Sequence, residues 1–464
     1  MIQIDFELTS AKLRPKLERL FELSAAKIRA IEKSWDPASV PPVVTVKGRY
    51  QPRDWTDWTR GFQYGSALLQ FDATGESWFL ECGREGTRKW MESYTTHTGV
   101  HDHGFNVVST FGNLARLAHE GKILATQPER DYYKLALKVS GAVQAARWVH
   151  ISGGGGYIYS FNGAHSLFVD TIRSLRSLGA AHQLGFALHE ESDRKVSLLE
   201  RLVQHAEATA RYSVYYGEGR DCYDVRGRVA HESLFNAKDG RYRCPNVQQG
   251  YSPFTTWTRG LAWAILGFAE QLEFIRTLPA EEFSALGGLE KIEAMMLRAA
   301  EATADFYLEQ TPADGIPYWD TGAPGLAKLG DYLSRSSDPF NDFEPVDSSA
   351  ASIAAQGLWR LGHYLERVRQ RAEQGNRYRQ AALTVAKTLL AEPYLSADLS
   401  HEGLILHSIY HRHRGWDHIP EGRKAPCGES CMWGDYHARE LALVLLRDAR
   451  QEPELYFFNV YTPW

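Results

Sequence analysis

Two aspartates stand in surroundings that could turn a carboxyl group into a proton donor or acceptor. Asp170 interrupts the apolar run Leu167–Arg173, and Asp102 lies between two histidines in His101–Phe105. Burial away from water raises the pKa of a carboxyl group toward the range that acid catalysis needs. Two such acids, with Trp, Arg, His and Gln nearby, indicate acid–base chemistry on a sugar. The structural alternative is that both aspartates cap helices, which would lower their pKa values instead.

The composition suits a protein that binds carbohydrate. The 464 residues include 13 Trp and 23 Tyr, and such rings offer flat surfaces on which sugars stack. The net charge is −5 without a basic stripe, so we expect no nucleic acid as a partner. The sequence shows no apolar span of membrane length and an acidic N-terminus, so we expect no membrane association and a cytoplasmic location. The oligomeric state does not follow from the sequence.

Metal and nucleotide signatures are weak in this sequence. Five cysteines in a chain of this length give no disulfide framework, and Cys427 and Cys431 alone make a poor zinc motif. The glycines 153–156 match neither a P-loop nor a dinucleotide fingerprint, and a mobile turn is the better interpretation. These motifs therefore do not indicate a zinc site or a nucleotide-binding loop.

The helices that must position the two acids follow a repeating order. A turn with polar or glycine residues opens an apolar helix, and a more amphipathic helix follows after a short break. Helices that are apolar all round pack inside, and amphipathic helices pack outside. We therefore predict an all-α fold, an (α/α)6 toroid of six inner and six outer helices. The predicted inner helices start near Trp58, Asp102, Asp170, Trp257, Asp347 and Trp433.

One closed barrel accounts for the whole length, so we predict a single catalytic domain over residues 1–464. An amphipathic helix from Ser10 to Lys33 and a Pro-rich excursion with a short β-type run at Val43–Val46 form its first part, about residues 1–55. In such a toroid the starts of the inner helices converge on one mouth. We expect the long loops before Asp170, Trp257 and Asp347 to shape a ligand site there.

Several short motifs, taken together and in order, resemble glycoside hydrolase family 88, the unsaturated glucuronyl hydrolases. The resemblance runs from about Trp58 to the region of Tyr436, which is most of the chain. The motifs are His101-Asp102-His103-Gly104-Phe105, Phe168-Val169-Asp170-Thr171, Gln249-Gly250-Tyr251, Trp257-Thr258-Arg259-Gly260-Leu261-Ala262-Trp263-Ala264, Gly315-Ile316-Pro317-Tyr318-Trp319-Asp320, Asp347-Ser348-Ser349-Ala350 and Trp433-Gly434-Asp435-Tyr436.

The resemblance implies an (α/α)6 barrel that needs no metal or organic cofactor. It also implies a substrate class, the oligosaccharides left by polysaccharide lyases, which end in a uronate with a C4=C5 double bond. The implied reaction is hydration of this vinyl ether. An acid protonates C4, water adds at C5, and the resulting hemiketal opens and expels the rest of the sugar.

The resemblance also assigns roles to individual residues. Asp170 resembles the proton donor to C4, which then takes a proton from water, and Asp102 resembles its partner, which holds the water or the substrate hydroxyls. Because Asp170 lies in the more apolar run, we expect it to be the more readily protonated. Arg259 with His231 could supply the cation for an anionic sugar, unless Arg259 only pairs with an acid and His231 is an exposed loop residue. The implied substrate-binding positions are Trp58, His231, Gln249, Trp257, Arg259, Trp263 and Ser430.

Some stretches depart from the family pattern and leave the particular lyase product open. They are the helix continuation after Asp170, the loop 153–165 and the segment 330–343, and His165 and Arg173 are candidates for altered specificity. The alternative functions are an unsaturated rhamnogalacturonyl hydrolase, a sugar epimerase relying on paired histidines, and a sugar-binding barrel without catalysis.

Overall fold

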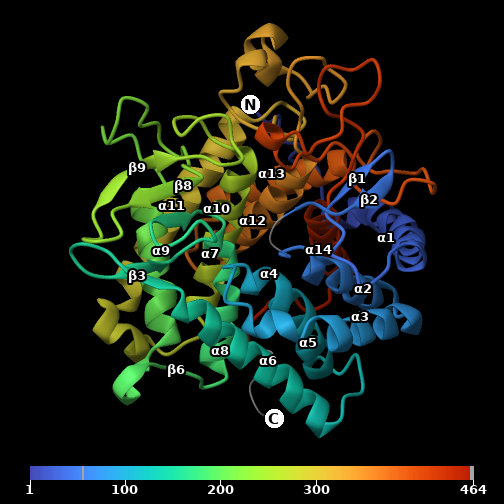
Figure 1. Ribbon diagram of the computed structural model, residues 1–464. Coiled ribbons are helices and arrows are strands. Elements are labelled where there is room, and N and C mark those ends of the chain that lie inside the picture. The colour runs from blue at the N-terminus through green and yellow to red at the C-terminus, as the bar shows by residue number, and fades with distance from the viewer. Residues whose placement is uncertain (55–56, 460–464) are drawn as a thin grey trace.

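The computed structural model describes residues 1–54 and 57–459, and its helices form a double ring (Figure 1). This arrangement confirms the predicted (α/α)6 toroid. Within the described residues, the inner ring consists of α2 (Arg60–Thr74), α4 with α5 (His103–Val107 and Asn113–His119), α7 with α8 (Thr171–Ser174 and Arg176–Gln183), α10 (Thr258–Ile275), α12 (Ser348–Arg367) and α14 (Met432–Ala449). The outer ring consists of α1 (Ser10–Ser34), α3 (Ser77–Trp90), α6 (Gln127–Ala146), α9 (Leu198–Tyr212), α11 (Leu289–Gln310) and α13 (Ala372–Leu389).

Burial separates the two rings as the sequence pattern predicts. Nearly every residue of α10 and α12 is buried, whereas α3 and α9 each bury one face. The inner helices pack closely where one of them carries a glycine. A Cβ added at Gly357 of α12 would lie 2.7 Å from the backbone nitrogen of Leu266 in α10, so only glycine permits this approach. At the ring's other side, α1 packs against α14 and α2 and takes the place of an outer helix.

Short antiparallel strands lie in the connections between the helices. The expected run near Val43 forms β1 (Val44–Val46), paired with β2 (Arg49–Gln51). The other pairs are β3 (Trp148–His150) with β4 (Gly156–Ile158), and β6 (Leu188–His189) with β7 (Lys195–Val196). A three-stranded sheet has the order β5 (Ser166–Phe168), β8 (Glu232–Phe235) and β9 (Tyr242–Asn246).

The three-stranded sheet brings two predicted site residues together. Phe168 ends β5 and faces Glu232, the first residue of β8. Beyond the strands, the backbone N–H of Val169 donates to the carbonyl of His231 at 3.0 Å. Asp170 and His231 are therefore neighbours at the mouth, although about sixty residues separate them.

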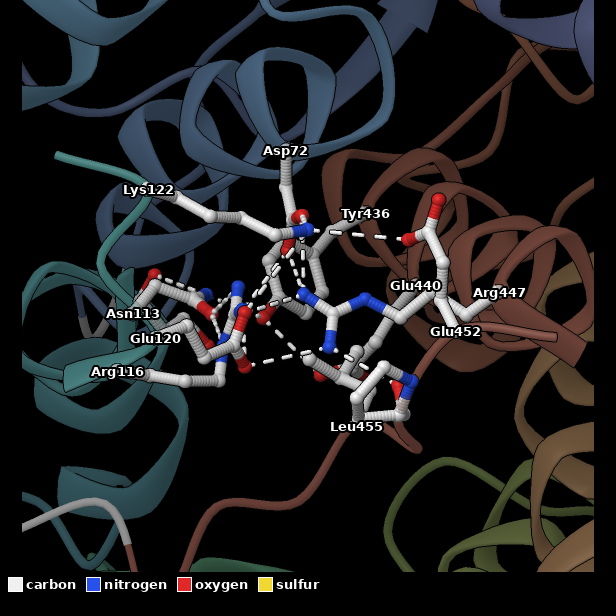
Figure 2. A network of polar contacts seen from close by, with 12 residues as sticks. Asp72, Asn113, Arg116, Glu120, Lys122, Tyr436, Glu440, Arg447, Glu452 and Leu455 are labelled. Carbon is white, nitrogen blue, oxygen red and sulfur yellow. Dashed lines mark hydrogen bonds and ion pairs between the residues drawn. The ribbon is translucent and has the colours of Figure 1, made fainter. Parts of the chain in front are cut away.

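The opposite end of the barrel is closed by a buried network of charges (Figure 2). Asp72 near the end of α2 accepts from Arg447 at 2.7 and 2.9 Å and lies 2.8 Å from Arg116 Nη1. Despite burial, Arg116, Arg447 and Lys122 hold the pKa of Asp72 well below its usual range. This end is filled with ion pairs, so the helix starts form the accessible end of the barrel.

None of the helices in the described residues combines the length and the apolar character that crossing a bilayer requires.

Candidate active site

A pocket of about 530 Å³ lies where the starts of the inner helices converge. Its lining combines aromatic rings with a few charged and polar side chains, as is typical of small-ligand sites. The pocket contains both predicted acids and five of the seven predicted binding residues. Its lining consists of Trp58, His101, Asp102, Phe161, Phe168, Asp170, Gln248, Gln249, Trp257, Arg259, Trp263, Tyr410 and His411.

The two aspartates stand at the first positions of inner helices without capping them. Asp102 precedes α4 and Asp170 precedes α7, and neither side chain accepts a cap hydrogen bond. Both carboxylates turn instead toward His101, whose Nε2 lies 3.3 Å from Asp170 Oδ2 and 3.8 Å from Asp102 Oδ1. The structural alternative of two helix caps is therefore wrong for these two side chains.

Burial and the shared histidine set the protonation of the two acids. Burial raises the pKa of Asp102 to about 6, although the charge of His101 opposes the change. Burial also acts on Asp170, but the hydrogen bond and the charge of His101 hold its pKa below the ordinary value. The expectation that Asp170 is the more readily protonated acid is therefore wrong for the free protein. The apolar run around Asp170 did not reveal that a histidine donates to its carboxylate.

Several buried polar atoms at the site have no hydrogen-bond partner among the described residues. They include Nδ1 of His101, Oδ1 of Asp170 and Nε2 of His231. A buried polar atom without a partner costs stability, typically about 1–3 kcal/mol. Because Asp170 lines the pocket, its unpartnered oxygen is a natural contact for a polar ligand.

His231 is a buried residue rather than an exposed loop residue. Its ring packs against Phe168 and Trp257, with ring centroids 4.6 and 4.4 Å apart. Its Nδ1 accepts from the backbone N–H groups of Gln248 and Gln249 at 3.1 and 3.3 Å. Burial lowers its pKa to about 4, so the ring is neutral at pH 7. His231 therefore supports the wall formed by Gln248 and Gln249 and does not supply the expected cation.

Arg259 is buried in α10 and is held on several sides. Its guanidinium donates to Asp347 at 3.0 Å, to Gln249 Oε1 at 2.5 Å and to the carbonyl of Tyr410 at 3.0 Å. Asp347 also caps α12 by accepting from Ser349 N–H at 3.0 Å. The alternative that Arg259 pairs with an acid is therefore confirmed, and its charge is balanced within the protein. Since Arg259 also lines the pocket, it joins two inner helices to the ligand site.

Aromatic rings form much of the remaining wall. Trp58 donates through Nε1 to the hydroxyl of Tyr410 at 3.1 Å, and its ring lies 4.9 Å from that of Trp433. Trp257 and Trp263 are almost fully buried, and each still lines the pocket. Apolar walls with a few fixed polar groups are typical of sites that bind a sugar ring.

Known hydrolases resemble this protein in sequence over most of its length. No protein-family model matches the chain. An unsaturated glucuronyl hydrolase of Formosa agariphila is 26% identical over 400 residues, which cover 83% of this chain and 78% of that protein. An unsaturated chondroitin disaccharide hydrolase of Streptococcus pyogenes is 22% identical, over 88% of this chain and 86% of that protein. The chain is thus similar to these two hydrolases over most of its length.

A solved structure shares the fold of the present protein. The crystal structure of an unsaturated glucuronyl hydrolase specific for heparin aligns with a TM-score of 0.70 at 18% identity, over 95% of this chain and 99% of that one. The similar hydrolases confirm the resemblance that the sequence motifs indicated. The structural alignment confirms the predicted toroid.

Besides His231, three residues with predicted roles lie away from the pocket lining. Ser430 is buried, donates to Asp435 Oδ1 at 2.7 Å and does not line the pocket. Arg173 is fully buried 2.7 Å from Glu270 and 3.0 Å from Glu440, so its candidacy for substrate specificity is wrong. His165 is exposed and is not part of the lining.

The sequence analysis did not assign a role to six lining residues. His101 and Phe168 stand within the quoted motifs, and adjacency to an acid was the signal that could have marked them. Tyr410 and His411 belong to the long loop before α14, which resembles the three loops that were expected to shape the site. The six residues are His101, Phe161, Phe168, Gln248, Tyr410 and His411.

The group formed by His101, Asp102 and Asp170 could in principle attract a cation. Among the described residues, it is the one group of three or more such side chains whose ligand atoms all lie within 4.8 Å of one another. However, His101 Nε2 is already within hydrogen-bond distance of Asp170. This internal contact favours proton exchange between His101 and Asp170.

Proposed function

We propose that this protein is an unsaturated glucuronyl hydrolase. It releases the 4,5-unsaturated uronic acid from the non-reducing end of lyase-generated oligosaccharides by hydrating the vinyl ether. The single observation that carries this proposal is the pair Asp102 and Asp170, which share His101 in one pocket lined by tryptophans. The named activities of the relatives support it.

The first step is protonation of C4 by Asp170. The uronate brings a third negative charge close to two buried carboxylates, and this charge raises the pKa values of both. A proton is therefore retained on the pair when substrate is bound. Asp170, through the unpartnered Oδ1, gives this proton to C4. The electron pair of C4=C5 forms the new C4–H bond, and the positive charge at C5 is shared with the ring oxygen.

The second step is addition of water at C5. Asp170, now ionised, takes a proton from a water molecule whose oxygen bonds to C5, and Asp102 holds that water or the sugar hydroxyls. His101 favours the ionised form of Asp170 in the free protein, so the carboxylate is available to accept this proton. The hemiketal then opens to a ketone at C5 and expels the remaining sugar. One water molecule is consumed, and Asp170 has regained its proton.

The walls of the pocket orient the uronate for this chemistry. Arg259 holds Gln249 by its Oε1, which leaves the Nε2 of that amide to donate to the ligand. His231 holds the backbone of Gln248 and Gln249 from behind. Trp58, Trp257 and Trp263 offer faces and edges against which the ring packs.

The test follows the ultraviolet absorbance of the conjugated C4=C5 bond. Unsaturated disaccharides from several lyases are incubated with the protein, and saturated disaccharides of the same linkage serve as controls. We expect loss of absorbance together with release of the reducing-end sugar from at least one unsaturated substrate. If no unsaturated uronide loses its absorbance, the proposed function is wrong.

The remaining expectations stay predictions. They are the single catalytic domain over residues 1–464, the cytoplasmic location, and a reaction without metal or organic cofactor. Which lyase product is preferred is decided by the same panel of disaccharides.

A further inference from the structure

We propose that His101 is the positioning residue of this site, because it holds Oδ2 of Asp170 and thereby presents Oδ1 to the substrate. This inference rests on the proposed function, since it concerns the carboxylate that exchanges protons with the sugar. It assigns His101 an effect through Asp170 rather than a bond to the substrate.

The structure fixes the ring of His101 in one place. Its backbone carbonyl accepts from Gln144 Nε2 and from Ser174 Oγ, both at 2.8 Å. Its ring stacks on Phe161, with centroids 6.1 Å apart and an angle of 17°, and meets the edge of Phe168 at 5.6 Å. With the backbone carbonyl held and two phenylalanine rings beside the imidazole, Nε2 lies within 4 Å of both carboxylates.

One oxygen of Asp170 is thus occupied and the other is not. Oδ2 lies 3.3 Å from His101 Nε2, while Oδ1 has no partner among the described residues. A carboxylate with one oxygen held cannot rotate freely about its last bond. The oxygen that meets the substrate is therefore already oriented, and displacing a reacting group by about 1 Å can reduce the rate about a hundredfold.

The position of His101 is costly to the fold, which argues against a purely structural role. Only 1% of its side chain is exposed, and its Nδ1 has no hydrogen-bond partner among the described residues. An apolar side chain would fill this place between two phenylalanines without a buried polar atom. A residue that reduces stability at a ligand site is expected where function needs it.

The charged groups around His101 show how replacing it would change the pKa of Asp170. Burial and Arg147 act to lower the pKa of His101, but Asp102 and Asp170 outweigh them and raise it above its ordinary value. The neighbouring rings of His103, His205 and His231 are kept neutral by burial, with pKa values lowered to about 4, 3 and 4. His101 is thus the group that lowers the pKa of Asp170 most, and its loss raises that pKa.

The experiment compares His101→Leu and His101→Gln with the wild-type protein in the absorbance assay. For His101→Leu we expect kcat to fall about 10- to 100-fold with KM within about threefold. The alkaline limb of the pH profile of kcat/KM moves to higher pH, because Asp170 keeps its proton longer. The melting temperature is not lowered. His101→Gln retains an N–H donor and recovers part of kcat.

His103→Gln is the matched control, because His103 is equally buried two residues away but contacts Ser140 and the carbonyl of His97 at 2.9 Å. We expect this variant to lower the melting temperature and to leave the alkaline limb in place. Wild-type kcat in His101→Leu, or a loss of activity that is equal at every pH and accompanied by a lower melting temperature, overturns the positioning role. If the wild-type protein consumes no unsaturated uronide, the proposed function itself is wrong.

Discussion

Arg259 Nη1 lies 3.0 Å from Asp347 Oδ2, although 88 residues separate them along the chain, and both side chains are buried. This ion pair ties α10 to α12 directly behind the pocket. The same guanidinium orients Gln249 and the backbone at Tyr410. The wall that faces the uronate therefore depends on a planar group with several donors in fixed directions.

Replacing Arg259 with lysine should damage both binding and stability. Lysine keeps the charge but cannot donate to Asp347, Gln249 and Tyr410 at once. We expect kcat/KM to fall about 10- to 100-fold and the unfolding free energy to drop by about 2–4 kcal/mol. Arg298→Lys is the control, since Arg298 is half exposed in a surface ion pair. Steady-state kinetics that do not distinguish the two variants would contradict this role.

Replacing Asp170 with asparagine should remove turnover and keep binding. The amide fills the same space but can neither give a proton to C4 nor take one from water. We expect kcat to fall by about 10³-fold or more, with ligand affinity by calorimetry changed less than about tenfold. Asp131→Asn, at an exposed position of α6, should leave both quantities unchanged. Undiminished turnover in Asp170→Asn would rule out this assignment.

The raised pKa of Asp102 predicts a pH-dependent stability. Its folded value is about 6, above the ordinary value of 3.8, so the folded state binds this proton more tightly than the unfolded state does. The contribution to stability is full below pH 3.8 and is lost as the pH rises through 6. In Asp102→Asn the side chain cannot ionise, so the unfolding free energy no longer decreases for this reason as the pH rises. Its unfolding free energy, measured against wild type, should improve by about 1–3 kcal/mol between pH 4 and pH 8, and a constant difference would contradict the assignment.

The sequence pattern predicted the toroid well because helix periodicity is a local property. All six expected helix starts correspond to inner helices, including those at Asp102, Asp170 and Trp257. The prediction that both acids lie in one pocket is confirmed in geometry. It succeeded because converging inner helices leave few places for their first residues.

The errors concern interactions between distant parts of the chain. The low pKa of Asp170 comes from His101, 69 residues earlier, and the neutrality of His231 comes from burial under Trp257 and Phe168. Ser430, which the family resemblance implied for substrate binding, donates to Asp435 instead and does not line the pocket. None of these effects has a periodic signal, because each depends on which loops meet in space.

The network at the closed end of the barrel predicts a stability effect without a catalytic one. Asp72→Asn leaves Arg116, Arg447 and Lys122 with too little negative charge in a buried place (Figure 2). We expect a loss of about 3–5 kcal/mol in unfolding free energy. Since the pKa of Asp72 is depressed, its contribution is present above pH 3.8 and lost as the pH falls below that value.

The measurement for this network is thermal unfolding at pH 7 together with kcat. Glu18→Gln is the control, because Glu18 forms an ion pair on the exposed face of α1. A large loss of kcat in correctly folded Asp72→Asn would show that the closed end communicates with the pocket, contrary to this account.

The most direct test of the central claim is the reaction in D₂O, followed by NMR of the earliest product. Addition of water across C4=C5 with Asp170 as donor places one deuterium stereospecifically at C4 and a ketone at C5 of the released uronic acid. We expect this product from the wild-type protein and none from Asp170→Asn. A released sugar that keeps its C4=C5 bond and carries no deuterium at C4 would mean direct cleavage at the anomeric carbon and would contradict the account.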